Sequence, residues 1–172
     1  MTARHPADLE LRSATADDVE LIHRLILELA EYEKRPGEAV VTALDLHRTL
    51  FGPRPYAEVI LARYRGELAG FALFFHNFST FQGQPGIYLE DLYVREAHRR
   101  FGVGKALMAR LAELAVERGC GRLDWTVLDW NQGAIDFYHR LGARAFDEWR
   151  HFRLTGDALT SLAAGAQEKA SR

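Results

Sequence analysis

The sequence predicts an α/β (α+β) protein in which a mixed sheet is covered by helices. Segments with apolar residues at helical spacing and strand-like segments follow the order β-α-α-β-β-β-α-β-α-β, which combines hairpins with crossover helices. The chain has 172 residues, 48% of them apolar, and shows no repeat, linker or low-complexity segment. We therefore expect a single domain over residues 1–172, with a core of about 9–154 and a C-terminal helical tail over 155–172.

The N-terminal half predicts two helices between a first strand and a run of three strands. Capping and acidic residues at Thr15–Asp18 precede a helix that ends near Pro36, and Gly52 ends a second helix. The sequence Arg65–Glu67 is typical of a hairpin turn. The ranges expected in this half are strands at 9–13, 57–64, 68–78 and 86–94 and a second helix at 42–50.

The C-terminal half predicts helices that alternate with strands. An apolar stripe beginning at Val103 predicts a helix that ends at Gly119, and Asn131 is expected to cap a helix that Gly142 stops. The other ranges expected here are strands at 123–128 and 144–154, a helix at 132–141 and the helical tail.

The most informative segment is a strand, a glycine-containing loop and a helix in direct succession. The strand Tyr88–Val94 precedes the loop Arg99–Gly104, and the apolar stripe follows. Such a loop directs several backbone N–H groups at one point, and the helix N-terminus adds the positive end of its dipole. The sequence therefore predicts a site for a phosphate-bearing ligand. Because Glu90 and Asp91 lie beside it, we expect an enzyme that moves a group from a phosphorylated carrier.

Two common phosphate motifs do not fit this loop. A P-loop needs glycine where Arg99 stands and Ser or Thr where Ala106 stands. A dinucleotide fingerprint needs a third glycine at the position of Leu107. The remaining pattern, Arg99-x-x-Gly102-x-Gly104, resembles the coenzyme-A pyrophosphate loop of the GCN5-related N-acetyltransferase (GNAT) family.

Further segments carry the same resemblance. Asn131–Ala143 resembles the family's second signature, in which an Asn opens a helix that bears the catalytic tyrosine. One branch of the family, the spermidine/spermine (diamine) and thialysine acetyltransferases, is resembled more closely in three segments: Tyr88–Val94, Arg12–Thr15 and Glu28–Glu33. The resemblance covers about residues 11–149. It implies a mixed, mostly antiparallel sheet that is splayed at the cofactor site and has helices on both faces.

The chemistry implied by this resemblance needs a base near the amine and an acid near the sulfur. A primary amine, with a reference pKa of about 10.4, arrives protonated, and a thiolate of reference pKa about 8.5 leaves more easily when protonated. Glu90 is the candidate base, acting through a water, and Tyr138 is the candidate acid. Asn131 and Tyr138 are seven residues apart and share one helix face. Glu90 and Asp91 are expected on opposite faces of the strand, and one of the two could serve only to balance a basic neighbour. Tyr138 could instead be a core aromatic residue.

The resemblance also implies cofactor and acceptor residues. The cofactor residues are Leu92, Tyr93, Val94, Arg99, Arg100, Phe101, Gly102, Val103, Gly104, Lys105, Asn131 and Ala134. The acceptor residues are Tyr32, Glu33, Glu90, Asp124, Trp125 and Thr126. The backbone of 92–94 would pair with the pantetheine arm as an extra strand. Glu33 and the basic loop residues could instead be solvated charges, and Asn131 an ordinary N-cap. Arg100 stands where close relatives often have glycine.

The leading function is N-acetyl transfer from acetyl-CoA to a primary amine of a small molecule, such as a polyamine, a diamine or thialysine. A protein lysine or N-terminus is the alternative acceptor. A non-catalytic acyl-CoA sensor is disfavoured, because it would need neither Glu90 nor Tyr138. The net charge of −2 and the lack of a long apolar run predict neither a nucleic-acid nor a membrane partner. Scattered histidines predict no metal, the single cysteine suits the cytoplasm, and the resemblance implies a homodimer.

Overall fold

The computed structural model describes residues 8–170. The chain divides into two compact units, Met1–Thr126 and Val127–Arg172, and each is described by itself. The single domain predicted from the sequence stays a prediction.

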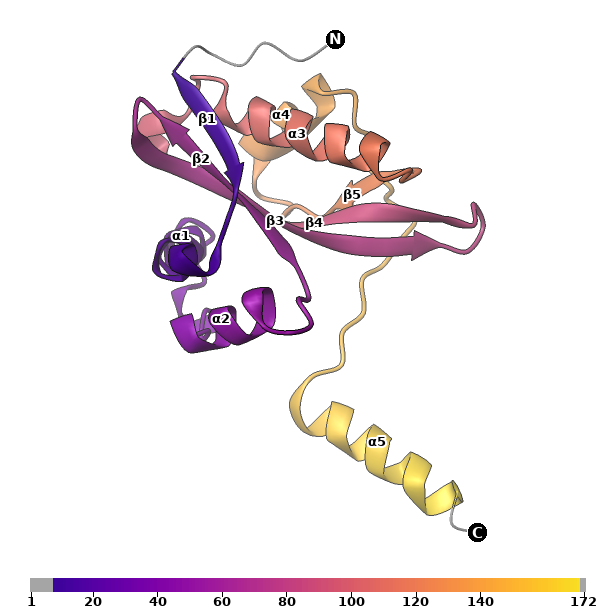
Figure 1. The fold of residues 1–172 in the computed structure, drawn as a ribbon. Coiled ribbons are helices and arrows are strands. Elements are labelled where there is room, and N and C mark those ends of the chain that lie inside the picture. Colours follow the sequence, from indigo (N-terminus) through magenta and orange to yellow (C-terminus); the bar gives the residue numbers. More distant parts are fainter. Residues whose placement is uncertain (1–7, 171–172) are drawn as a thin grey trace. The chain divides into compact units, whose positions relative to one another are not determined.

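The first unit is built on one five-stranded sheet (Figure 1). Its strands are β1 (Leu9–Ser13), β2 (Glu58–Tyr64), β3 (Glu67–Ser79), β4 (Gln84–Val94) and β5 (Leu123–Trp125). They lie side by side in that order, with antiparallel pairing from β1 to β4. β5 runs parallel to β4, because the chain crosses over through a helix between them. The predicted α/β class and the mixed, mostly antiparallel sheet are confirmed.

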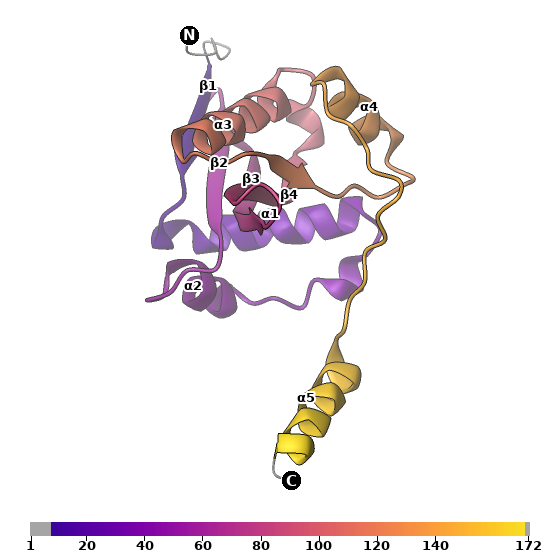
Figure 2. The ribbon, with the colours of Figure 1, turned by 90° about the vertical axis from the view of Figure 1, so that its right-hand side faces the viewer.

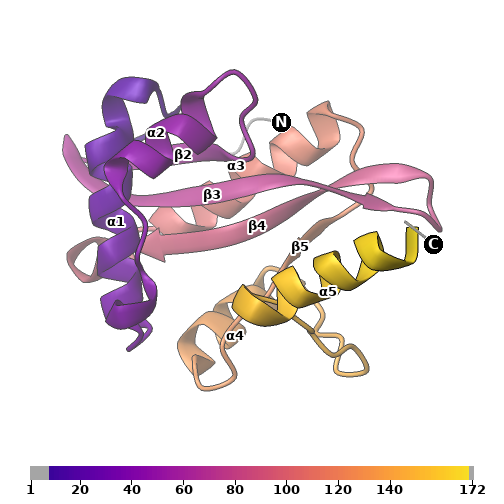
Figure 3. The ribbon, with the colours of Figure 1, turned by 90° about the horizontal axis from the view of Figure 1, so that it is seen from below.

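Helices cover both faces of this sheet, as predicted. α1 (Val19–Tyr32) and α2 (Ala43–Phe51) lie on one face, and α3 (Val103–Glu117) lies on the other (Figures 2 and 3). Polar side chains fix where the helices begin. The Asp18 carboxylate accepts a hydrogen bond from the Thr15 backbone N–H at 2.8 Å, and the Thr42 hydroxyl accepts one from the Asp45 N–H at 3.1 Å. Short 3-10 turns occupy Ala16–Asp18, Pro36–Glu38 and Glu96–His98.

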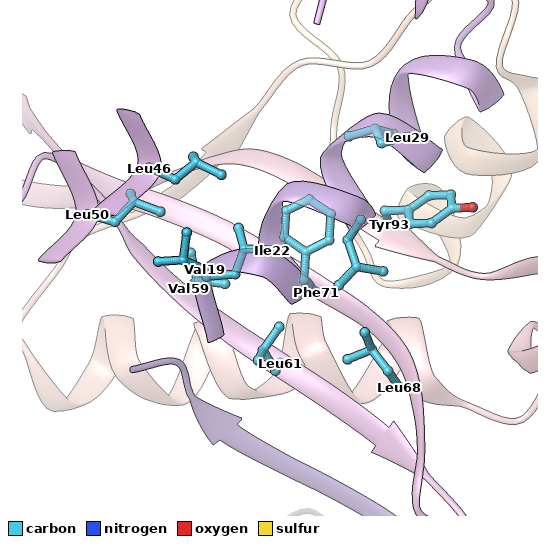
Figure 4. Close-up of a cluster of buried hydrophobic side chains, with 11 residues drawn as sticks. Val19, Ile22, Leu29, Leu46, Leu50, Val59, Leu61, Leu68, Phe71 and Tyr93 are labelled. Atoms are coloured by element: carbon cyan, nitrogen blue, oxygen red, sulfur yellow. The ribbon is translucent and has the colours of Figure 1, made fainter. Parts of the chain in front are cut away.

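Two apolar layers hold the first unit together, one on each face of the sheet. On the α1/α2 side, Ile22 of α1 packs with Phe71 of β3 and Tyr93 of β4 (Figure 4). On the α3 side, side chains at alternate strand positions, such as Phe74 and Leu89, are almost completely buried. A fully buried side chain of this size contributes about 1.5–3 kcal/mol. The register of β4 therefore decides which face each of its residues serves.

The second unit contains α4 (Gln132–Arg140) and α5 (Gly156–Ala170). The predicted strand over 144–154 is wrong. Alternating apolar residues favour a strand, but a strand needs a neighbouring edge for its N–H and C=O groups, and within residues 8–170 no strand pairs with this segment. β5 of the first unit is also shorter than expected, since it ends at Trp125. None of the helices in the described part of the chain has the length and apolar character needed to cross a bilayer.

Candidate active site

β4 and β5 separate partway along β4, which leaves the rest of β4 with an open edge. The two strands pair only over Ile87–Leu89 and Leu123–Trp125. β4 continues to Val94 and pairs there with β3. On the side of β5, the backbone of Glu90–Val94 faces no strand of the described chain, so an extended ligand with amide groups can pair with it. The splay expected from the sequence lies at this point.

A β-bulge at Glu90 lies where the strands separate. Phe74 of β3 pairs with Leu89 and Leu73 pairs with Asp91, so Glu90 is an extra residue between two pairs. Leu89 is buried on the α3 face, whereas Leu73 packs against the cluster on the α1/α2 face. The bulge therefore turns Asp91 to the α1/α2 face. The regular alternation expected at Glu90 and Asp91 is interrupted, and that expectation is wrong.

Carboxylates gather around Asp91 on this face. Burial raises the pKa of Asp91 from its ordinary 3.8 to about 7, and the negative charges of Glu90 and Glu33 add to the effect. Burial likewise raises the pKa of Glu33, at the C-terminal end of α1. Glu90 itself is exposed. A carboxyl group that titrates near neutral pH can accept or release a proton at working pH, as sites of general acid–base chemistry require.

The glycine loop ends in a helix start that suits an anion. Arg100 and Gly102 have left-handed φ angles of 68° and 82°, and α3 begins directly afterwards at Val103. Gly102 has no side chain to cap the helix, and the first turn of α3 contains no acidic residue. The N–H groups of that turn lack acceptors within the helix and lie at the positive end of its dipole. With Arg100 and Lys105 both exposed beside them, these groups fit a diphosphate.

Two contacts, each between residues that are far apart in the sequence, anchor the loop. The Phe101 ring stacks on Tyr64 of β2, with 5.1 Å between ring centroids. Arg95, which follows β4, donates hydrogen bonds of 2.8 and 2.6 Å to the carboxylate of Glu28 on α1. Phe101 therefore has a structural contact with the sheet, and its role toward a cofactor stays a prediction. Sequence reasoning missed Tyr64, Arg95 and Glu28 as supports, because no local pattern links them.

Arg99 joins the loop to the acceptor residues expected from the sequence. Its Nε donates a hydrogen bond of 2.9 Å to the Val94 carbonyl. Its guanidinium carbon lies 4.5 Å from the centroid of the Tyr32 ring, and that ring lies 6.3 Å from the ring of Tyr93. The structure therefore brings Tyr32, Tyr93 and Arg99 together, and the charge of Glu33 acts on Asp91 nearby.

Asp124, on β5, belongs to a separate polar cluster. Its carboxylate accepts a hydrogen bond of 3.0 Å from Asn77 Nδ2 and forms a 2.8 Å ion pair with Arg122 Nε. Trp125 and Thr126 follow it at the end of β5. Because its charge is already balanced by Arg122, Asp124 is a weaker candidate for binding an amine than the carboxylates around Asp91. Sequence reasoning missed both Asn77 and Arg122.

In the second unit, Asn131 caps α4 as predicted. Its side-chain oxygen accepts a hydrogen bond of 3.3 Å from the Ala134 N–H. Tyr138 lies two turns further along, on the same side of the helix, and its ring is 5.3 Å from that of Phe137. The roles of Asn131, Ala134 and Tyr138 toward a cofactor stay predictions.

No metal centre is found in the part of the chain that the structure describes: nowhere in it do three or more His, Cys, Asp or Glu residues lie close enough together to hold a metal ion.

Comparisons with known proteins agree with one another. Residues 22–143 match the model of the acetyltransferase (GNAT) family. The chain is 36% identical to an L-ornithine N5-acetyltransferase of Arabidopsis thaliana, over 88% of this chain and 86% of that one. It is 37% identical to a thialysine N-epsilon-acetyltransferase of Bos taurus, over 89% and 96%. Among solved structures, an integron cassette protein from the mobile metagenome of V. cholerae matches with a TM-score of 0.77 and 27% identity, over 92% and 99% of the two chains.

Proposed function

The chain belongs to the acetyltransferase (GNAT) family, and on this premise we propose that it acetylates a primary amine of a small molecule with acetyl-CoA as donor. The acceptor class is a polyamine, a diamine or a lysine analogue such as thialysine. One observation carries the proposal. The open edge of β4 is followed in the chain by the glycine loop, and α3 begins after this loop without a side-chain cap. Such an edge suits an amide-bearing arm, and such a helix start suits a diphosphate.

The chain's own groups divide the binding of the donor. Backbone groups of Leu92, Tyr93 and Val94 pair with the extended arm, and the N–H groups of the loop 99–105 hold the diphosphate. Arg100 and Lys105 add positive charge there. Acetyl-CoA, when bound, supplies the acetyl thioester. We assign cofactor binding also to Asn131 and Ala134, which lie at the start of α4.

Three side chains share the proton transfers. Glu90, exposed in the bulge, takes a proton from the acceptor ammonium, directly or through water. Asp91, the next residue, accepts protons near neutral pH because of its raised pKa. The Tyr138 hydroxyl donates a proton to the departing sulfur.

The charge around the bulge favours a small cationic acceptor. The charges of Glu33 and Glu90 both act on Asp91, so a compact ammonium near these residues is attracted by more than one carboxylate. The Tyr32 ring borders the acceptor beside these carboxylates. The opposite side of the proposed acceptor site is lined by Asp124, Trp125 and Thr126. Two relatives are named for ornithine and thialysine, which both carry a terminal primary amine.

We also propose a homodimer located in the cytoplasm. The homodimer rests on the resemblance to the diamine branch, and the location on Cys120 being the one cysteine of the sequence. Light scattering coupled to size-exclusion chromatography checks the first, and a mass that corresponds to one chain would refute it.

A thiol-release assay with acetyl-CoA tests the function. The panel contains spermidine, putrescine, thialysine, ornithine, lysine, an aminoglycoside and a lysine-containing peptide. We expect turnover on at least one di- or polyamine or lysine analogue, with kcat/KM above that of the peptide. Turnover on the peptide alone would replace the acceptor, and binding of acetyl-CoA without any turnover would favour a sensor.

A further inference from the structure

We propose that Arg99 is a positioning residue for the amine acceptor, because its guanidinium holds the Tyr32 ring at the acceptor end of the site. The inference rests on the proposed function, in which Tyr32 borders the acceptor. It goes beyond that function, since it gives a loop residue a role toward the amine. The phosphate loop and the acceptor site would then share one side chain.

The geometry fixes the orientation of the Arg99 side chain. Nε donates to the carbonyl of Val94, the last residue of β4, at 2.9 Å. The guanidinium carbon then lies 4.5 Å from the centroid of the Tyr32 ring, within the range of a cation–π contact. The centroid of the Tyr32 ring also lies 6.3 Å from that of the buried Tyr93 ring. Tyr32 is thus held between a fixed cation and a core aromatic.

The neighbouring arginine has a different environment. Arg100 has a left-handed φ of 68° and an exposed side chain, whereas Arg99 is half-buried. Arg100 is therefore placed to meet solvent or a phosphate, while Arg99 already donates to the strand and contacts the ring. The two adjacent arginines form a natural matched pair for an experiment.

The position of Tyr32 matters because it ends α1 directly before Glu33. The charge of Glu33 acts on Asp91, and burial raises the pKa of both carboxyls. The Tyr32 ring therefore lies next in the chain to one of the carboxylates that attract the amine. Since the same arginine belongs to the phosphate loop, any effect of acetyl-CoA on the affinity for the amine would be matched by an equal effect of the amine on the affinity for acetyl-CoA.

The first test compares Arg99→Gln with Arg100→Gln at saturating acetyl-CoA, with thialysine as the acceptor. We expect Arg99→Gln to raise KM for thialysine about fivefold, the scale of a partly buried cation–π contact. Arg100→Gln should raise the Kd of acetyl-CoA, measured by calorimetry, and leave KM for thialysine within about twofold. Arg99→Lys keeps the charge but loses the Nε donor, and should resemble Arg99→Gln.

The second test is a double-mutant cycle on KM for thialysine with Arg99→Gln, Tyr32→Leu and the double variant. If Arg99 acts through Tyr32, the double variant should be no worse than the worse single variant. Effects that multiply, or an unchanged KM in Arg99→Gln, would overturn the inference while the wild type still acetylates amines. A wild type that acetylates no amine of the panel would overturn the proposed function itself.

Discussion

The strongest quantitative prediction concerns Asp91→Asn, which should make the protein more stable at alkaline pH. In the folded protein the pKa of Asp91 is raised from 3.8 to about 7, mainly by burial. As pH rises from 4 to 7, the unfolded chain therefore loses a proton that the folded chain retains, and stability falls. Asn resembles the protonated carboxyl in size and shape, so the variant lacks this loss.

The pKa values set the size of the effect. At about 1.36 kcal/mol per pKa unit, the difference between 3.8 and about 7 corresponds to at most about 4 kcal/mol. Asp91 is only half-buried, and solvent screening reduces this figure, so we expect a gain of about 2 kcal/mol at pH 8. The gain should shrink toward pH 5 and vanish below pH 4. Urea unfolding of both proteins from pH 4 to pH 8 measures it.

Asp18→Asn is a control of opposite sign. Hydrogen bonds of 2.6 and 2.7 Å from Arg12 hold the pKa of Asp18 well below its ordinary range. Its stabilisation is therefore present above pH 4 and is lost as pH falls through the lowered pKa. The Asp18 variant should be less stable than the wild type at pH 8. An Asp91→Asn variant that is no more stable at pH 8, or whose gain does not depend on pH, would refute the account of the acidic bulge.

Three further substitutions test other parts of the account. Tyr138→Phe should lower kcat by roughly 10²-fold with little change in acetyl-CoA affinity, because the lost proton donor acts in the transition state; near-normal turnover with chemistry rate-limiting would show that Tyr138 only packs. Gly102→Val should abolish measurable acetyl-CoA binding in calorimetry, because a β-branched residue is strained at a φ of 82°; unchanged affinity in a folded variant would contradict the loop assignment. Gly86→Ala should cost about 1–3 kcal/mol in urea unfolding, because its Cβ would meet Asn77 Oδ1 and lie 2.9 Å from Arg122 Cγ; an unchanged midpoint would show that these side chains move aside.

Local patterns were sufficient to predict the elements that carry the site. The helix start after Gly102 follows from a glycine, a basic loop and an apolar stripe within a few residues, and the structure has it where expected. The Asn131 cap is likewise encoded within one helical turn. In both cases the chemistry that fixes the conformation lies between sequence neighbours.

Features that depend on distant partners could not be predicted. The bulge at Glu90 exists only because β3 pairs with Leu89 and Asp91 in a shifted register, so the sequence of β4 alone suggested regular alternation. The contact between Arg99 and Tyr32 joins segments 67 positions apart. The strand expected over 144–154 failed for the related reason that strand propensity forms no ladder without a neighbouring edge.

One competition experiment tests the central claim most directly. Equal concentrations of thialysine and a lysine-containing peptide are incubated with the enzyme and limiting acetyl-CoA, and both products are quantified by mass spectrometry. The account predicts that N-acetylated thialysine accounts for most of the acetyl-CoA consumed. Acetylated peptide in excess over acetylated thialysine, or no acetylated product while the thioester stays intact, would contradict it.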